Sequence, residues 1–294
     1  MQCFSPITAF KLRDGGLSFS EIKDSREIAI RCGQCIGCRV YRAESWTTRI
    51  LHEAKMHSCS IFLTLTYDDE HLPPGGSLHY PHVQKFFRAQ RQKLGKFRFF
   101  VCGEYGDQTS RPHYHAILFG FDYPDRVQLN SSYAKRPVYK SAALAKLWPY
   151  GTHQIGFISP ESARYVAQYS IKKVTGKRAQ AHYERLDPVT GEISRLVPEF
   201  ARMSLRPALG RPWLEKYGQE ILTHDNIVLN GSFHGIPRYY NEKLLQMFPM
   251  EMEALQAKRA LNALEKSDDN TRQRLETKAA VASAKHKFYS QRNL

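Results

Sequence analysis

The stretch "KFRFFVCGEYGDQTSRPHYHAILFGF", residues 96 to 121, predicts an antiparallel pair of strands at the centre of the fold. Residues 96–106 and 112–121 are rich in aromatic and aliphatic side chains, and the polar loop DQTSR separates them. Apolar runs of this kind, bounded by polar turn residues, are typical of strands. The two segments therefore form a hairpin with a long loop.

The segments before this hairpin predict one more strand and two helices. Residues 60–67, SIFLTLTY, are apolar and β-branched and read as a buried strand. Residues 80–94 place Val83, Phe86, Phe87 and Leu94 on one face with basic residues opposite, which indicates an amphipathic helix. Residues 40–57 show a similar helical spacing.

The segments after the hairpin complete a recognisable order. SAALAKLWPY predicts a short helix, HQIGFIS a strand, and residues 160–174 a helix opened by Ser159 and Pro160. From residue 60 the order is β-α-β-β-α-β followed by a helix, the split β-α-β pattern of ferredoxin-like folds. We therefore expect an α+β domain in which helices flank a central antiparallel sheet.

The net charge points to a polyanionic partner. Lys and Arg number 43 against 28 Asp and Glu, which leaves a formal charge of +15 and a pI near 9.6. Such a balance favours nucleic acid, although a basic face can also simply be solvated. No stretch approaches the roughly 18 apolar residues of a membrane span, and the N-terminus does not resemble a signal peptide. We expect a cytosolic protein.

His113 and His115 are candidate metal ligands. In a strand, alternate residues share a face, so both imidazoles point the same way. Glu104 lies on the preceding strand of the same hairpin and can reach them. Two imidazoles and one carboxylate with open coordination positions suit a catalytic Mn²⁺ or Mg²⁺. The alternative is a strand that carries two structural histidines.

The helix 160–174 contains a second candidate group. Tyr165 and Tyr169 are one turn apart, and Lys172 falls on the same stripe with Lys173 beside it. Aromatic residues at helical spacing are often core residues. A separate apolar face on this helix instead allows the phenols to face a site, and its residues are Val166, Ala167 and Ile171.

Together these motifs resemble one family. FLTLTYDD (62–69), GEYGDQTSRPHYHAILFG (103–120) and RYVAQYSIKK (164–173) are similar to the three ordered motifs of replication initiators from the Microviridae, most like the gokushovirus type. CGQCIGCRVYRAESWTTR and SLRPALGRPWLEKY also resemble that group. By this similarity the chain is identified as a member of the HUH endonucleases.

The resemblance implies a rolling-circle initiator that nicks and rejoins viral origin DNA through a 5′-phosphotyrosine. Glu104, His113 and His115 would hold Mg²⁺ or Mn²⁺, Tyr165 and Tyr169 would attack in turn, and Lys172 would stabilise charge. The implied partners are single-stranded and supercoiled origin DNA and the host helicase and polymerase, in the host cytoplasm. The residues expected to touch DNA or support the site are Thr64, Thr66, Arg111 and Lys173.

Two other functions remain open from the sequence. A related HUH transposase or relaxase would share the metal and tyrosine chemistry. A non-catalytic binding module would use a ferredoxin-like sheet with exposed aromatic residues, as RNA-recognition domains do. Such a module would bind DNA and never cut it.

The N-terminal segment is rich in cysteine. Cys32, Cys35 and Cys38 form C-x2-C-x2-C, and Cys3 could supply a fourth thiolate to a structural Zn²⁺. Free reduced thiols and an iron–sulfur cluster are the alternatives.

These features predict four segments. They are a Cys-rich element (1–39), an HUH nicking domain (40–175), an irregular basic extension (176–250) and a helical or partly disordered tail (251–294).

Overall fold

We describe a computed structural model of the chain, which covers residues 3–106, 109–129, 137–169, 173–174, 176, 179–186 and 191–292. The side chains of Tyr169 and of residues 289–292 are outside this description. The chain forms two compact units. The sheet unit comprises residues 46–218, and the terminal unit comprises residues 1–45 and 219–294.

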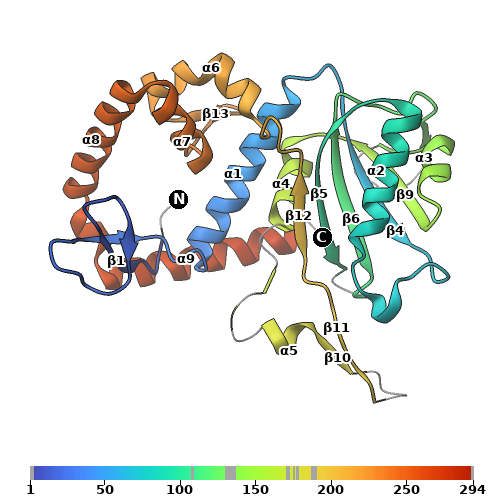
Figure 1. The fold of residues 1–294 in the computed structure, drawn as a ribbon, viewed down its shortest axis with the longest axis horizontal. Coiled ribbons are helices and arrows are strands. Elements are labelled where there is room, and N and C mark those ends of the chain that lie inside the picture. The colour runs from blue at the N-terminus through green and yellow to red at the C-terminus, as the bar shows by residue number, and fades with distance from the viewer. Residues whose placement is uncertain are drawn as a thin grey trace. The chain divides into compact units, whose positions relative to one another are not determined.

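The sheet unit is built on a seven-stranded sheet (Figure 1). Its strand pairings are antiparallel, including those on both sides of the central strands. In spatial order the strands are β12 (Phe200–Met203), β5 (Arg98–Tyr105), β6 (Pro112–Phe119), β4 (Ser60–Tyr67), β9 (Gly151–Phe157), β8 (Val138–Lys140) and β7 (Val127–Leu129).

The four inner strands confirm the predicted split β-α-β connections. Strand β4 leads through helix α2 (Tyr80–Leu94) to β5, and β6, which follows β5 in a hairpin, lies between them. In the same way β6 leads through α3 (Ala142–Leu147) to β9, with β4 between. The predicted α+β class with a large antiparallel sheet and flanking helices is therefore confirmed.

Two apolar layers cover the two faces of the sheet. Strand β4 alternates strictly, so Ile61, Leu63 and Leu65 are buried on one face while Phe62 and Thr64 lie on the other. The first face packs against α2 and α3. The second packs against the end of α1 (Ile36–Ala54) and against α4 (Pro160–Tyr169). The predicted metal ligands lie on this second face.

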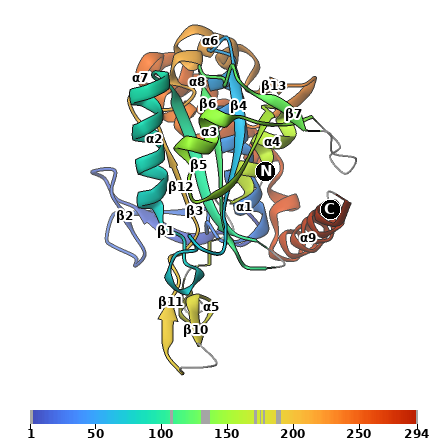
Figure 2. The same ribbon diagram turned by 90° about the vertical axis from the view of Figure 1, so that its right-hand side faces the viewer.

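The segment 176–250 was predicted to be irregular, and this prediction is wrong for much of it. Strand β12 extends the sheet beside β5, and α6 (Arg211–His224) follows it. Helix α5 (Ala179–Tyr183) leads into a short hairpin of β10 (Glu184–Leu186) and β11 (Ile193–Arg195), which extends away from the sheet (Figure 2). The functional division into four segments stays a prediction.

The terminal unit contains a small N-terminal sheet and the C-terminal helices. The sheet has the order β2 (Leu17–Ser18), β1 (Ile7–Lys11), β3 (Arg26–Ile30). The tail expected to be helical or partly disordered is helical where it is described. The remaining elements are β13 (Ile227–Leu229), β14 (Ser232–His234), α7 (Arg238–Met247), α8 (Pro249–Glu265) and α9 (Arg272–Arg292), with short 3-10 turns at Pro74–Gly76 and Ser267–Asn270.

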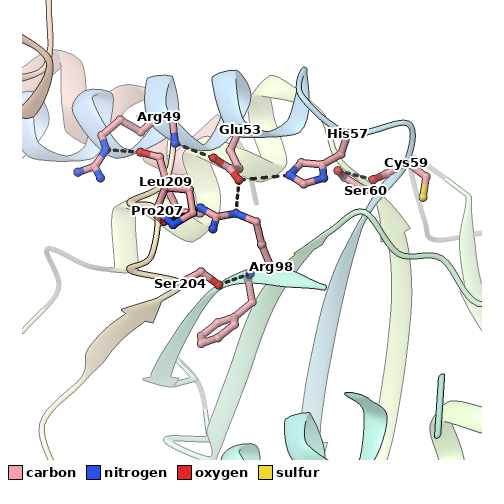
Figure 3. A network of polar contacts seen from close by, with 11 residues as sticks. Arg49, Glu53, His57, Cys59, Ser60, Arg98, Ser204, Pro207 and Leu209 are labelled. Carbon is pink, nitrogen blue, oxygen red and sulfur yellow. Dashed lines mark hydrogen bonds and ion pairs between the residues drawn. The ribbon is translucent and has the colours of Figure 1, made fainter. Parts of the chain in front are cut away.

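A buried carboxylate ties α1 to β5 and to the segment before α6. Glu53 is fully buried and accepts hydrogen bonds from Arg98 Nε, from His57 Nε2 at 3.2 Å and from the Gly210 amide at 2.7 Å (Figure 3). Arg98 also donates to the Pro207 carbonyl, which fixes the chain after β12. The carboxylate therefore joins three segments that are distant in sequence.

Glu53→Gln is expected to destabilise the sheet unit by about 3 kcal/mol, because it leaves the Arg98 guanidinium without its buried counter-charge. All three tryptophans, Trp46, Trp148 and Trp213, belong to this unit, so tryptophan fluorescence during urea unfolding reports on it. Glu70→Gln, at an exposed site, is the matched control and should change the free energy of unfolding by less than about 0.5 kcal/mol. Equal stability of the two variants would show that the network contributes nothing.

Candidate active site

The hairpin β5–β6 and strand β4 bring the predicted ligands together on one face. In the register of the sheet, His113 pairs with Glu104 and with Thr66, and His115 pairs with Thr64. Directly paired residues on adjacent antiparallel strands project to the same face. Both histidines therefore lie on the face covered by α4, and Tyr114 between them is buried on the opposite face.

His115 is held at both ring nitrogens. Its Nε2 lies 2.8 Å from Glu104 Oε1, and its Nδ1 lies 3.1 Å from Thr64 Oγ1. Both His115 and Glu104 are buried, and the ring of Phe62 stacks on the imidazole at 5.7 Å. A threonine hydroxyl can donate or accept, so Thr64 can support either neutral tautomer of His115. This is the supporting role that was one of the two expected for Thr64.

His113 is oriented by the backbone. Its Nδ1 lies 2.6 Å from the carbonyl oxygen of Arg111, and a carbonyl only accepts, so Nδ1 carries the proton. Burial lowers the pKa of His113 below its usual value, which favours the neutral ring. Its Nε2 is therefore the nitrogen with a free electron pair for a ligand.

The donor set fits a divalent cation such as Mg²⁺ or Mn²⁺. Glu104 and His115 already bring a carboxylate oxygen and a ring nitrogen within 2.8 Å of each other. His113 lies on the same face, directly opposite Glu104 in the hairpin. Among the described residues, only a cluster of four cysteines has ligand atoms that all lie within 4.8 Å of one another. The metal assignment of the triad stays a prediction.

Tyr165 lies directly beside this face. Its ring meets His115 edge to face, with the ring centroids 5.1 Å apart and the planes at 79°, and it also contacts Phe62. Helix α4 packs on the sheet through Ala163, Val166 and Ala167, all fully buried. Tyr165 itself is 42% exposed, so its phenol is accessible. The expectation of a separate apolar face on this helix is confirmed for Val166 and Ala167.

The remaining predicted residues are placed less completely. Tyr169 ends α4, but its side chain lies outside the described residues, as do Ile171 and Lys172. Lys173 is exposed. Arg111 donates from Nη1 to the Tyr67 carbonyl at 2.9 Å and pairs with Asp69. This contact joins the start of β6 to the loop after β4.

Sequence reasoning missed two contributors to the site. Phe62 packs on both His115 and Tyr165, and the carbonyl of Arg111 sets the tautomer of His113. The alternation of FLTLTY contained a signal for Phe62, because it lies two residues before Thr64 and so shares its face. A backbone carbonyl has no sequence signal.

The comparisons with known proteins define the class. The family model for the replication-associated protein ORF2 matches residues 60–174, the span from β4 past the end of α4. The whole arrangement of the histidines, Glu104 and Tyr165 therefore falls within a replication-associated region.

Relatives outside this region extend the similarity. The chain is 32% identical over 285 residues to "Replication-associated protein VP4" of Bdellovibrio phage phiMH2K, covering 92% of this chain and 86% of the relative. It is 29% identical over 236 residues to "Replication-associated protein ORF2" of Spiroplasma virus 4, covering 76% and 68%. It is 28% identical over 234 residues to "Replication-associated protein ORF4" of Chlamydia phage 1, covering 76% and 55%. The chain belongs to the family of phage replication-associated proteins.

No solved structure matches the chain. Within the described part of the chain, none of the helices combines the length and apolar character that crossing a membrane requires.

Proposed function

We propose that the protein initiates phage DNA replication as a metal-dependent endonuclease and ligase of the HUH type, which cuts one strand at the viral origin. The observation that supports this most is the contact of the accessible Tyr165 ring with His115, which is itself bonded to Glu104, on one face of the sheet. A nucleophile beside a candidate ligand set, in a family of replication-associated proteins, fits strand cleavage better than binding alone.

Glu104, His113 and His115 would hold Mg²⁺ or Mn²⁺ in this proposal. When bound, such a cation would polarise the scissile phosphate and stabilise the charge of the transition state. Thr64 and the Arg111 carbonyl keep the two imidazoles oriented through their Nδ1 atoms. Phe62 packs on the His115 ring and keeps water from that side of it.

The tyrosines perform the covalent step. The phenolic oxygen of Tyr165 or Tyr169 bonds to phosphorus and gives up its proton, while the bond from phosphorus to the 3′ oxygen breaks. That oxygen takes up a proton, which leaves a 5′-phosphotyrosine and a 3′-hydroxyl for a polymerase to extend. An unperturbed tyrosine, with a pKa of about 10, is a weak nucleophile at neutral pH, so we assign charge stabilisation to Lys172 or Lys173.

Two tyrosines one turn apart permit a second attack after a round of synthesis. The second phenol can cut the regenerated origin while the first is still linked to DNA, and the free 3′-hydroxyl then releases a circular genome. This relay would operate in the host cytoplasm with the host helicase and polymerase, on single-stranded and supercoiled origin DNA.

The test uses the full chain with Mn²⁺ and labelled single-stranded origin oligonucleotides. We expect a protein–DNA adduct that survives denaturation, together with a shortened DNA product that has a 3′-hydroxyl. A non-catalytic binder would retard the DNA without cutting it, and this result would contradict the proposal. A transposase or relaxase would cut but would not release rejoined circular genomes from a template with two origins.

DNA binding should weaken steeply with salt, because electropositive side chains supply most of the affinity. Helix α2 alone exposes four cationic residues, Lys85, Arg88, Arg91 and Lys93. For single-stranded DNA the logarithm of the affinity falls by about 0.7 per logarithmic unit of salt for each phosphate contacted, so about five contacts give a slope near −3.5. Fluorescence anisotropy from about 50 to about 200 mM salt measures this slope. A flat profile would refute the electrostatic account.

A further inference from the structure

The terminal unit contains a compact cluster of four thiols outside the candidate active site. Cys3 precedes β1, Cys32 and Cys35 follow β3, and Cys38 lies in the first turn of α1. Their sulfur atoms all lie within 4.8 Å of one another. The fold therefore brings a residue near the N-terminus to three residues about thirty positions further along the chain.

The spacing of the sulfur atoms matches that of four thiolates around one metal ion. Cys3 Sγ lies 3.7 Å from Cys32 Sγ and 3.8 Å from Cys35 Sγ. A tetrahedral zinc ion with Zn–S bonds of about 2.3 Å holds its sulfurs about 3.8 Å apart. A disulfide would bring two sulfurs to about 2.05 Å, and all four cysteines are free. A cluster of several irons would place its thiolates on different metal atoms and so farther apart.

Backbone amides point at these sulfurs. The amides of Phe4 and Cys35 donate to Cys35 Sγ and Cys32 Sγ, each at 3.3 Å. The amides of Cys32 and Gln34 donate to Cys3 Sγ and Cys32 Sγ, each at 3.4 Å. Several N–H donors directed at a group of sulfurs stabilise negative charge there, and thiolates are the form that binds metal.

The turn between Cys32 and Cys35 is shaped for this arrangement. Gly33 has a φ of +74°, a left-handed conformation that suits glycine. Its carbonyl accepts a hydrogen bond from Arg42 on α1 at 3.2 Å. The turn is therefore anchored to the helix that also carries Cys38.

The small N-terminal sheet has little apolar core of its own. Of the ten residues in β1 and β3, only Ala9 is buried. Small elements that cannot bury enough apolar surface are commonly stabilised by a metal or by disulfides. A cross-link between Cys3 and the start of α1 would supply this stabilisation.

We propose that Cys3, Cys32, Cys35 and Cys38 bind one structural Zn²⁺ that joins the N-terminal sheet to the start of α1. Four thiolates fill the tetrahedral coordination sphere, so the ion has no open position for a substrate. The site is separate from the residues proposed for DNA cleavage, and neither proposal depends on the other.

The test measures metal in the full-length protein, purified with reductant and freed of loosely bound ions by gel filtration. We expect about one equivalent of zinc per chain by elemental analysis. Cys35→Ser should lower the zinc content at least tenfold, while Cys59→Ser, a thiol outside the cluster, should leave it unchanged. Iron in place of zinc, or metal no higher than background in the unsubstituted protein, would overturn the proposal.

A second measurement covers the case in which Cys35→Ser does not fold. The unsubstituted protein grown with Co²⁺ should show the visible absorption bands of tetrahedral cobalt and the near-ultraviolet sulfur-to-metal charge-transfer band. Chelation should then increase amide hydrogen exchange in β1, β3 and the first turns of α1. Cobalt spectra without thiolate bands, or unchanged exchange after complete metal removal, would contradict the assignment.

Discussion

Replacing His115 with alanine is expected to lower the rate of DNA cleavage by about a thousandfold while DNA binding largely survives. The imidazole lies between Glu104 and Thr64 and contacts Tyr165, so its removal deletes a metal ligand and one wall of the site. The loss of one group that stabilises transition-state charge costs about 10²- to 10³-fold. Binding depends on charges spread over the surface and should change little. Single-turnover cleavage with Mn²⁺ and fluorescence anisotropy measure the two effects separately.

Two companion variants make the result specific. Thr64→Val keeps the shape of the side chain but removes the hydrogen bond to His115 Nδ1, and a smaller loss of about 10- to 100-fold is expected. His224→Ala removes an exposed imidazole at the end of α6 and should leave cleavage unchanged. Full cleavage by His115→Ala would mean that the histidines are only residues of a strand.

The second large effect is expected from the tyrosines. Tyr165→Phe keeps the ring against His115 and removes only the hydroxyl, so the fold should be unaffected while adduct formation falls or shifts to Tyr169. The double change of Tyr165 and Tyr169 to Phe should eliminate the covalent adduct, because no phenolic oxygen remains on α4. Denaturing gel electrophoresis with labelled DNA detects the adduct.

Tyr139→Phe on β8 is the matched control for the tyrosines. Tyr139 is half-buried in the same sheet and packs against Phe157, away from the histidines. It should form the adduct at the normal rate. An adduct formed at the normal rate by the double Phe variant would show that neither tyrosine is the nucleophile.

The parts of the fold that periodicity controls could be predicted from the sequence. The helix predicted over residues 80–94 is observed at Tyr80–Leu94, because Val83, Phe86 and Phe87 form a buried stripe against the sheet. The strand predicted over residues 60–67 is observed at Ser60–Tyr67, because its alternation matches one core face and one site face. Local pattern and tertiary packing agree at these positions.

Strand β12 could not be predicted in this way. It has only four residues and pairs with β5, about a hundred positions earlier in the chain. So short a run carries no periodic signal, and its place at the edge of the sheet depends on the long-range contacts of Arg98 with Glu53 and Pro207.

The candidate site divides along the same physical line. The shared face of His113 and His115 follows from the two-residue period of a strand, and the position of Glu104 opposite His113 follows from the hairpin register. The contact of Tyr165 with His115 depends instead on how α4 packs through Ala163 and Val166. The residue pattern allowed a helix that faces the site, but only the three-dimensional packing brings this phenol to this imidazole.

The central claim is that a tyrosine of α4 attacks a phosphate held at the histidine face, and mapping the adducted residue tests it most directly. The full chain is incubated with Mn²⁺ and single-stranded origin DNA, digested with protease and nuclease, and the peptide that carries a residual nucleotide is sequenced by mass spectrometry. We predict that the nucleotide is linked to Tyr165 or Tyr169, and that His115→Ala yields no such peptide. A nucleotide linked to any other residue, or DNA cleaved without a linked peptide, would contradict the account.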